Sequence, residues 1–103
     1  LERVFTPREL DYCRRFSDPW PHLAARFAAK ESVIKAFGSS IEPLEIEVVR
    51  DLKEPPRVVL HGSAELAMKD MGIMKIKLSI SHSGGLASAQ AIALGGNPIS
   101  HSP

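Results

Sequence analysis

The chain has 103 residues, which suits one compact domain, and its 44% of hydrophobic residues are enough to form a core, so intrinsic disorder is excluded. Thirteen Lys and Arg against twelve Asp and Glu leave a formal net charge of +1, which excludes a purely electrostatic nucleic-acid binder. The long uncharged stretch from Leu78 to Leu94 carries too many polar residues to span a bilayer, so we expect neither nucleic acid nor a membrane as a partner.

The start of the sequence and its single cysteine indicate the cellular compartment of the protein. Cys13 cannot form an intrachain disulfide and no secretory signal pattern opens the sequence, so we expect a cytoplasmic protein. The first residue is Leu1 and not a methionine, and we therefore expect residues to be missing before it. Because large apolar side chains are few, a further strand or a second copy of the chain would add to the core.

The first predicted element is a helix over residues 7–16. Thr6, Pro7 and Glu9 have the types and the spacing of a capping box with proline in the first helical position. Basic residues on this helix, set against Glu9 and Asp11, are typical of a solvated face but also suit an acidic partner. These basic residues are Arg8, Arg14 and Arg15.

A second helix is predicted to begin at either Asp18 or the Trp20 region and to cover residues 22–37, and Gly38 is expected to end it. Apolar side chains form one stripe of this helix and small side chains form another nearly opposite, so both faces look packed. The charged residues between these stripes are therefore expected to be partly buried, and they are Arg26, Lys30, Glu31 and Lys35. Because buried charges are rarely found without partners, these four are candidates for a site.

Two strands and a short helix are predicted next. Leu44, Ile46 and Val48 alternate with glutamates, which predicts a half-buried strand, and residues 57–61 form its hairpin partner. Ser63 is then expected to cap a helix that covers residues 64–71 and ends at Gly72.

The chain ends in a second predicted hairpin. Apolar residues and His82 share one face of its first strand, which places His82 at a sheet end, and a loop at Gly84 and Gly85 leads into the last strand. One face of that last strand is smooth enough for a helix to pack closely, because it is lined by Ala87, Ala89, Ala91 and Ala93. The element order predicts an α+β fold with a largely antiparallel sheet, as one domain over residues 1–94 and a flexible tail over residues 95–103.

Glu31 and Lys35 lie one turn apart on a helix face, where they form either a salt bridge or part of a site. Glu31 could supply one oxygen ligand to magnesium, and no second acid is obvious. Lys30 and Arg26 either extend outward or pair with phosphate, with the outward position favoured for Arg26. Gly38 and the serines that follow it, Ser39 and Ser40, either end the helix or offer N–H groups to a phosphate.

His82 has three open interpretations: a structural histidine, a phosphate contact or a proton-transfer group. Ser81 points to the opposite face, so a Ser and His nucleophile pair is not expected. The histidines and Cys13 show no zinc-binding spacing.

The run FAAKESVIKAFG, from Phe27 to Gly38, closely resembles the signature helix of the holo-acyl-carrier-protein synthases, the small 4′-phosphopantetheinyl transferases. Three further segments resemble this family in the same order along the chain. They are RVFTPRELDYC from Arg3, LEIEVVRD with PRVVLHGSA in the centre, and LSISH from Leu78.

The resemblance implies a magnesium-dependent transferase that moves the 4′-phosphopantetheine arm of coenzyme A onto a serine of apo acyl carrier protein and releases adenosine 3′,5′-bisphosphate. It implies that Glu31 is a metal ligand, that Lys35 lies near the transferring phosphate and that His82 contacts the phosphates of the coenzyme. Either Glu31, through a metal-bound water, or Lys35 would be the general base. It also implies a homotrimer with coenzyme A between protomers, and an acidic carrier that suits the arginines of the first helix.

The family also has a leading strand whose aspartate supplies another metal ligand, and no residue before Arg3 matches it. One hypothesis is therefore an active transferase whose leading strand is absent from this sequence. A second is a non-catalytic module that binds coenzyme A and keeps the scaffold without the N-terminal metal-binding aspartate. A third, a small binding protein with a basic helix and no nucleotide site, fits the resemblance least.

Overall fold

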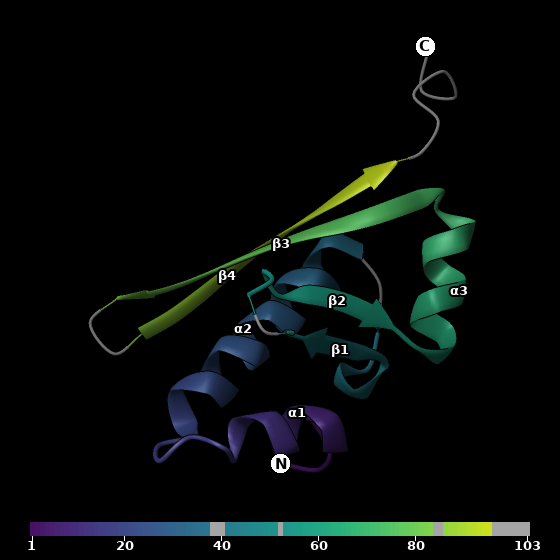
Figure 1. Ribbon diagram of the computed structural model, residues 1–103. Helices are drawn as coiled ribbons and strands as arrows, with labels where there is room; N and C mark the ends of the chain where they lie inside the picture. Colours follow the sequence, from purple (N-terminus) through teal and green to yellow (C-terminus); the bar gives the residue numbers. More distant parts are fainter. Residues whose placement is uncertain (38–40, 52, 84–85, 96–103) are drawn as a thin grey trace.

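A computed structural model describes residues 1–37, 41–51, 53–83 and 86–95 of the chain. Within these ranges the order of helices and strands is the predicted one, and the α+β class is confirmed (Figure 1). The elements are α1 (Pro7–Cys13), α2 (Trp20–Phe37), a 3₁₀ turn η1 (Pro43–Glu45), β1 (Ile46–Val49), β2 (Arg57–Leu60), α3 (Gly62–Asp70), β3 (Ile73–Ser83) and β4 (Leu86–Gly95). None of these helices is both long enough and apolar enough to cross a membrane.

The strands form two antiparallel pairs. β1 pairs with β2, with Ile46 opposite Leu60, and β3 pairs with β4 from Ile73 opposite Gly95 to Ser83 opposite Leu86. Antiparallel pairing is as predicted, but the strands make two separate two-stranded sheets and not one. The expected loop at Gly84 and Gly85 and the tail beyond β4 lie outside the described residues.

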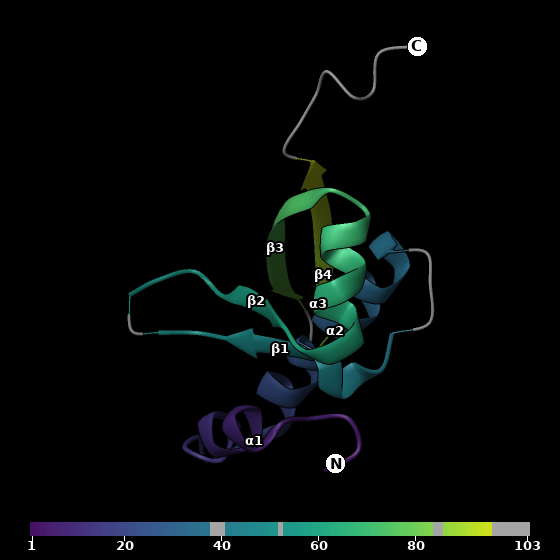
Figure 2. The ribbon, with the colours of Figure 1, turned by 90° about the vertical axis from the view of Figure 1, so that its right-hand side faces the viewer.

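α2 is the element that joins the molecule together. It contacts both strands of the long β3–β4 hairpin on one side and β1 on another, and α1 lies beyond the β1–β2 pair (Figures 1 and 2). The alanines of β4 are half-buried while the residues between them are exposed. Small side chains let a helix approach a strand closely, so the predicted packing of this smooth face against a helix is confirmed.

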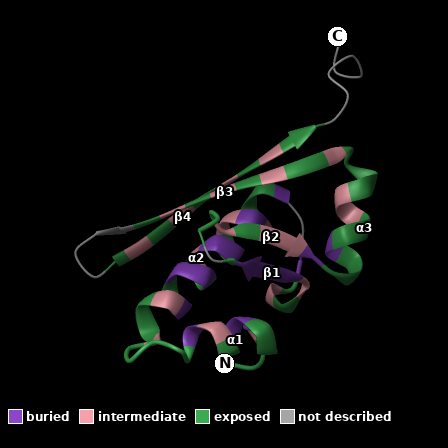
Figure 3. Ribbon diagram, in the orientation of Figure 1, coloured by how far each residue is buried: buried purple, intermediate pink, exposed green. Residues whose placement is uncertain are grey.

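The core consists of two clusters, which appear as the buried segments of Figure 3. The larger lies where α2 meets β1, β2 and α3, and its buried members are Val33, Phe37, Ile41, Ile46, Leu60 and Ala64. The smaller joins α1 to α2 through Phe5, Leu10, Cys13 and Leu23. Burial raises the pKa of the Cys13 thiol, which fits a packing role for this residue.

Several element limits differ from the prediction. α1 ends at Cys13, three residues early, whereas α2 begins at Trp20, one of its two predicted starts. Leu44 lies in η1 and is 41% exposed, and all four residues of β1 are buried. The prediction of a half-buried strand is therefore wrong. β1 lies between β2 and the helices and has no face toward solvent.

α3 is also capped differently from the prediction. It begins at Gly62, whose φ of +59° turns the chain into the helix, and its N-cap residue is His61. Ser63 does not cap the helix but donates a hydrogen bond to the Glu45 carboxylate, which also accepts from Ala64 N at 3.0 Å. The hydrogen bond from Ser63 is the main cause that lowers the pKa of Glu45. The cap thus comes from η1, while Gly72, at a φ of +69°, follows the helix end as predicted.

Candidate functional site

Glu31 and Lys35 lie on the exposed side of α2, so the expectation that they are partly buried is wrong. Neither makes a hydrogen bond or an ion pair with any other described residue, and the salt bridge that their spacing allows is not formed. This carboxylate and this ammonium group lie one turn apart, and within the described residues no other group competes with a ligand for them. An exposed carboxylate suits magnesium, but the described residues include no group of three His, Cys, Asp or Glu side chains placed to hold a metal, so Glu31 would be one ligand among several.

Lys30 is buried, as expected, with 1% of its surface exposed. Its Nζ lies 2.8 Å from Glu9 Oε1 and donates to the carbonyl of Pro43 at 2.9 Å and to that of Ile46. Burial lowers the pKa of this ammonium, and the hydrogen bond and charge of Glu9 oppose the change. All three N–H donors face protein oxygens, so Lys30 neither extends outward nor has a donor left for a phosphate, and both expected positions are corrected.

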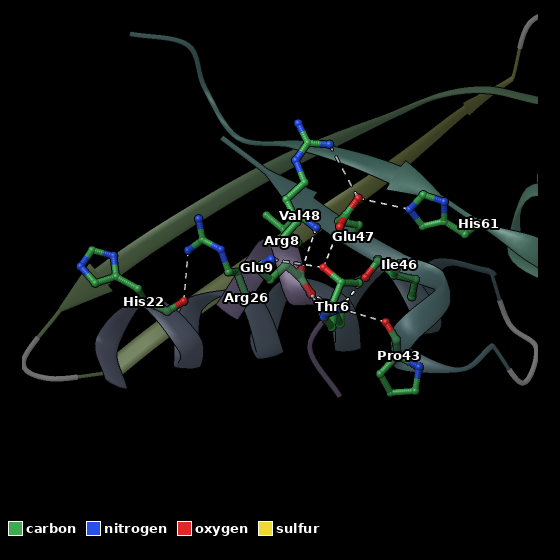
Figure 4. A network of polar contacts seen from close by, with 11 residues as sticks. Thr6, Arg8, Glu9, His22, Arg26, Pro43, Ile46, Glu47, Val48 and His61 are labelled. Carbon is green, nitrogen blue, oxygen red and sulfur yellow. Dashed lines mark hydrogen bonds and ion pairs between the residues drawn. The ribbon is translucent and has the colours of Figure 1, made fainter. Parts of the chain in front are cut away.

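Glu9 and Glu47 extend this buried network between α1 and β1 (Figure 4). The capping box of Thr6 and Glu9 is confirmed, but Glu9 is buried and not solvated, and it also accepts from Val48 N at 2.8 Å. Glu47 accepts from Thr6 Oγ1 at 2.6 Å and lies 3.2 Å from His61 Nε2. Burial would raise the pKa of Glu47, but the hydrogen bonds of Thr6 and His61 outweigh it and lower the pKa.

A pocket of about 860 Å³ opens beside this network, between α1, the first turns of α2, the end of β1 with the segment after it, and Ile80 of β3. Its charged lining is mostly basic, with Asp11 and Asp51 set against Arg8, Arg15, Arg26, Arg50 and Lys53. A concave site with convergent cations suits an anionic ligand such as a phosphate.

Arg26 is the buried cation of this pocket. Only 4% of its surface is exposed, which corrects the expectation that it extends outward. Its Nη1 donates to the carbonyl of His22 at 3.2 Å, and its Nε is buried without a partner among the described residues (Figure 4). A guanidinium with an unused N–H can bind a phosphate oxygen. The packed faces of the helix predict this burial, and they made Arg26 one of the four candidates for a site.

The other expected site residues have different outcomes. Arg8, Arg14 and Arg15 are exposed, as a surface for an acidic partner requires. His82 occupies the expected strand end, opposite Ala87, but its side chain lies outside the described part of the structure, as do Gly38, Ser39 and Ser40. The Ser81 hydroxyl lies 2.7 Å from that of Ser88 across the hairpin.

Known proteins resemble this chain over most of its length. A family model described as the 4′-phosphopantetheinyl transferase superfamily matches residues 1–83. The holo-[acyl-carrier-protein] synthase of Caldanaerobacter subterraneus subsp. tengcongensis is 46% identical over 99 residues, which cover 93% of this chain and 78% of that protein. The enzyme of the same name from Chlamydia trachomatis is 44% identical over 97 residues, with 90% and 78% covered.

Solved structures give the same result. The holo-[acyl-carrier-protein] synthase of Neisseria meningitidis has a TM-score of 0.81 at 29% identity and covers 90% of this chain and 78% of its own. The Helicobacter pylori synthase in complex with coenzyme A has a TM-score of 0.76 at 28% identity, with 91% and 80% covered. The chain therefore belongs to the 4′-phosphopantetheinyl transferase superfamily, within its family of holo-acyl-carrier-protein synthases.

Proposed function

We propose that this protein transfers the 4′-phosphopantetheine arm of coenzyme A to a serine of apo acyl carrier protein, with magnesium as cofactor. The observation that carries the proposal is the 46% identity to a named holo-[acyl-carrier-protein] synthase over 93% of the chain. Glu31 and Lys35 on α2, which have no partner among the described residues, support the proposal. Both residues lie within the segment that resembles the family's signature helix.

In the proposed reaction the serine oxygen bonds to the phosphorus of the pantetheine phosphate. The bond from that phosphorus to adenosine 3′,5′-bisphosphate breaks, and the serine proton passes to a base. Glu31 would hold the metal, which when bound neutralises the pyrophosphate. The Lys35 ammonium would stabilise the negative charge that develops on the leaving phosphate. Glu31, through water, or Lys35 in its neutral form would be the base.

We place a phosphate of coenzyme A in the basic pocket, where the Nε of Arg26 is buried without a partner among the described residues. His82 is a further proposed contact, which rests on the family resemblance. The N–H groups at Gly38 and Ser39 are also proposed contacts, on the ground that N–H groups after a helix can bind a phosphate. Arg8, Arg14 and Arg15 are the proposed contacts to the acidic carrier. The proposal also includes a homotrimer and a cytoplasmic location. It takes residues 1–94 as one domain, preceded by a strand that bears a metal-binding aspartate.

The test incubates the protein with coenzyme A, magnesium and apo acyl carrier protein and follows the intact mass of the carrier. We expect the carrier to gain the mass of one phosphopantetheine, and chelation of magnesium to stop the gain. A known synthase in a parallel reaction controls for the competence of the carrier. An unmodified carrier, together with calorimetric binding of coenzyme A, would support the non-catalytic module instead. An unmodified carrier without binding would refute both.

A further inference from the structure

The guanidinium of Arg26 lies against the ring of Tyr12. Its central carbon is 4.4 Å from the centre of that ring, which is within the range of a cation–π contact. Tyr12 belongs to α1 and Arg26 to α2, so the contact joins the two helices that border the basic pocket.

Tyr12 is itself held in place by two further rings. It meets Phe16 edge-to-face with ring centres 5.4 Å apart, and it meets His22 in the same way at 6.4 Å. Phe16 and His22 stack on each other at 3.7 Å. The three rings form a cluster across the α1–α2 connection, and such edge-to-face and stacked contacts favour a defined ring orientation.

The contact with Tyr12 fixes the guanidinium without using its hydrogen bonds. An aromatic ring attracts the flat face of a guanidinium. The five N–H donors of the guanidinium point outward within its own plane. One donor is used by the carbonyl of His22, and the buried Nε has no partner among the described residues. Tyr12 therefore sets the plane of the group without using any of its N–H donors.

We infer that Tyr12 is a positioning residue, whose ring holds the Arg26 guanidinium in the orientation that binds a phosphate of coenzyme A. The inference rests on the proposed function, because it takes coenzyme A as the ligand of the pocket. Tyr12 acts through Arg26 and has no role in the chemical step.

The test compares Tyr12→Leu, which removes the ring, with Tyr12→Phe, which keeps it. The Tyr12 hydroxyl makes no hydrogen bond with a described residue, so Tyr12→Phe is a matched control. We expect Tyr12→Leu to weaken coenzyme A binding in calorimetry, and to raise the KM for coenzyme A, by about tenfold with kcat changed by less than about twofold. Tyr12→Phe should match the wild type, and Tyr12→Met, tested in parallel, should behave as Tyr12→Leu.

A second arm separates positioning from packing. In an Arg26→Lys background there is no planar guanidinium to orient. Tyr12→Leu should then weaken coenzyme A binding by less than about twofold, whereas a merely structural role would give the same tenfold loss in both backgrounds. If the wild type binds coenzyme A and Tyr12→Leu binds it equally well, the role of Tyr12 is overturned while the proposed function stands. If the wild type binds no coenzyme A, the proposed function is what fails, and this inference fails with it.

Discussion

Replacing Lys30 by methionine should destabilise the protein severely, because the ammonium is fully enclosed. The substitution keeps the length of the side chain but leaves the buried Glu9 carboxylate without its cation, and it leaves the carbonyls of Pro43 and Ile46 without a donor. Removing one partner of a buried ion pair costs about 3 to 5 kcal/mol. A domain of this size is stable by about 5 to 15 kcal/mol in total, so the variant should lose a large part of its free energy of unfolding.

Urea unfolding followed by circular dichroism measures this loss. Each kcal/mol lowers the Tm of a domain of this size by about 4 to 8 °C, so thermal melting should show a decrease of at least about 12 °C. Lys35→Met is the matched control, because Lys35 lies on the same helix, is exposed and has no partner among the described residues. Its free energy of unfolding should change by less than about 0.5 kcal/mol. A Lys30→Met protein as stable as Lys35→Met would refute the structural role of Lys30.

Three further predictions concern pH, the carrier and the alanine face of β4. The pKa of Glu47 is lowered from its ordinary 4.5, so the unfolded chain takes up protons first and stability is lost as the pH falls below that value. Urea unfolding at decreasing pH should therefore show that the free energy of unfolding falls less steeply with pH for Glu47→Gln than for the wild type. An equal pH dependence in the two proteins would contradict the lowered pKa of Glu47. Arg14→Glu should raise the KM for the carrier about two- to tenfold, and more strongly at low salt, whereas Lys69→Glu on α3 should leave it unchanged; equal effects would remove α1 from the carrier surface. Ala89→Leu should cost about 1 to 3 kcal/mol in denaturant unfolding because it overpacks against α2, and the neighbouring exposed position, as Gln90→Leu, should cost little.

Local patterns in the sequence predicted the local features of the fold. The capping box of Thr6 and Glu9, the helix end before Gly72 and the alternation along the last hairpin each depend on residues within one turn or one strand pair. The family resemblance was likewise visible, because the signature run lies within one helix.

The long-range partners could not be predicted from the sequence. Glu9 is buried because Lys30 and Val48, the latter 39 residues further along the chain, both reach its carboxylate. A helical wheel shows that residues share a face, but it does not show which face meets the sheet. In α2 the packed positions include Ala25 and Ala29, which are 3% and 0% exposed, whereas Phe27 is 44% exposed.

The same limit explains the site. The basic pocket is built from two helices, two strands and the segment after β1, so no single motif reveals it. The packed faces of the second helix implied that its charges are buried, which holds for Arg26 and Lys30. Glu31 and Lys35 are exposed instead, because their side of α2 has no described element packed over it.

The exposed carboxylate of Glu31, as a magnesium ligand, is the central group of the proposed transfer reaction. The most direct test measures turnover of apo acyl carrier protein by Glu31→Gln, with the melting temperature of the variant measured in parallel. Because Glu31 has no partner among the described residues, we predict an unchanged melting temperature and a loss of turnover of more than about 100-fold. A variant that folds normally and transfers phosphopantetheine at the wild-type rate would contradict the account.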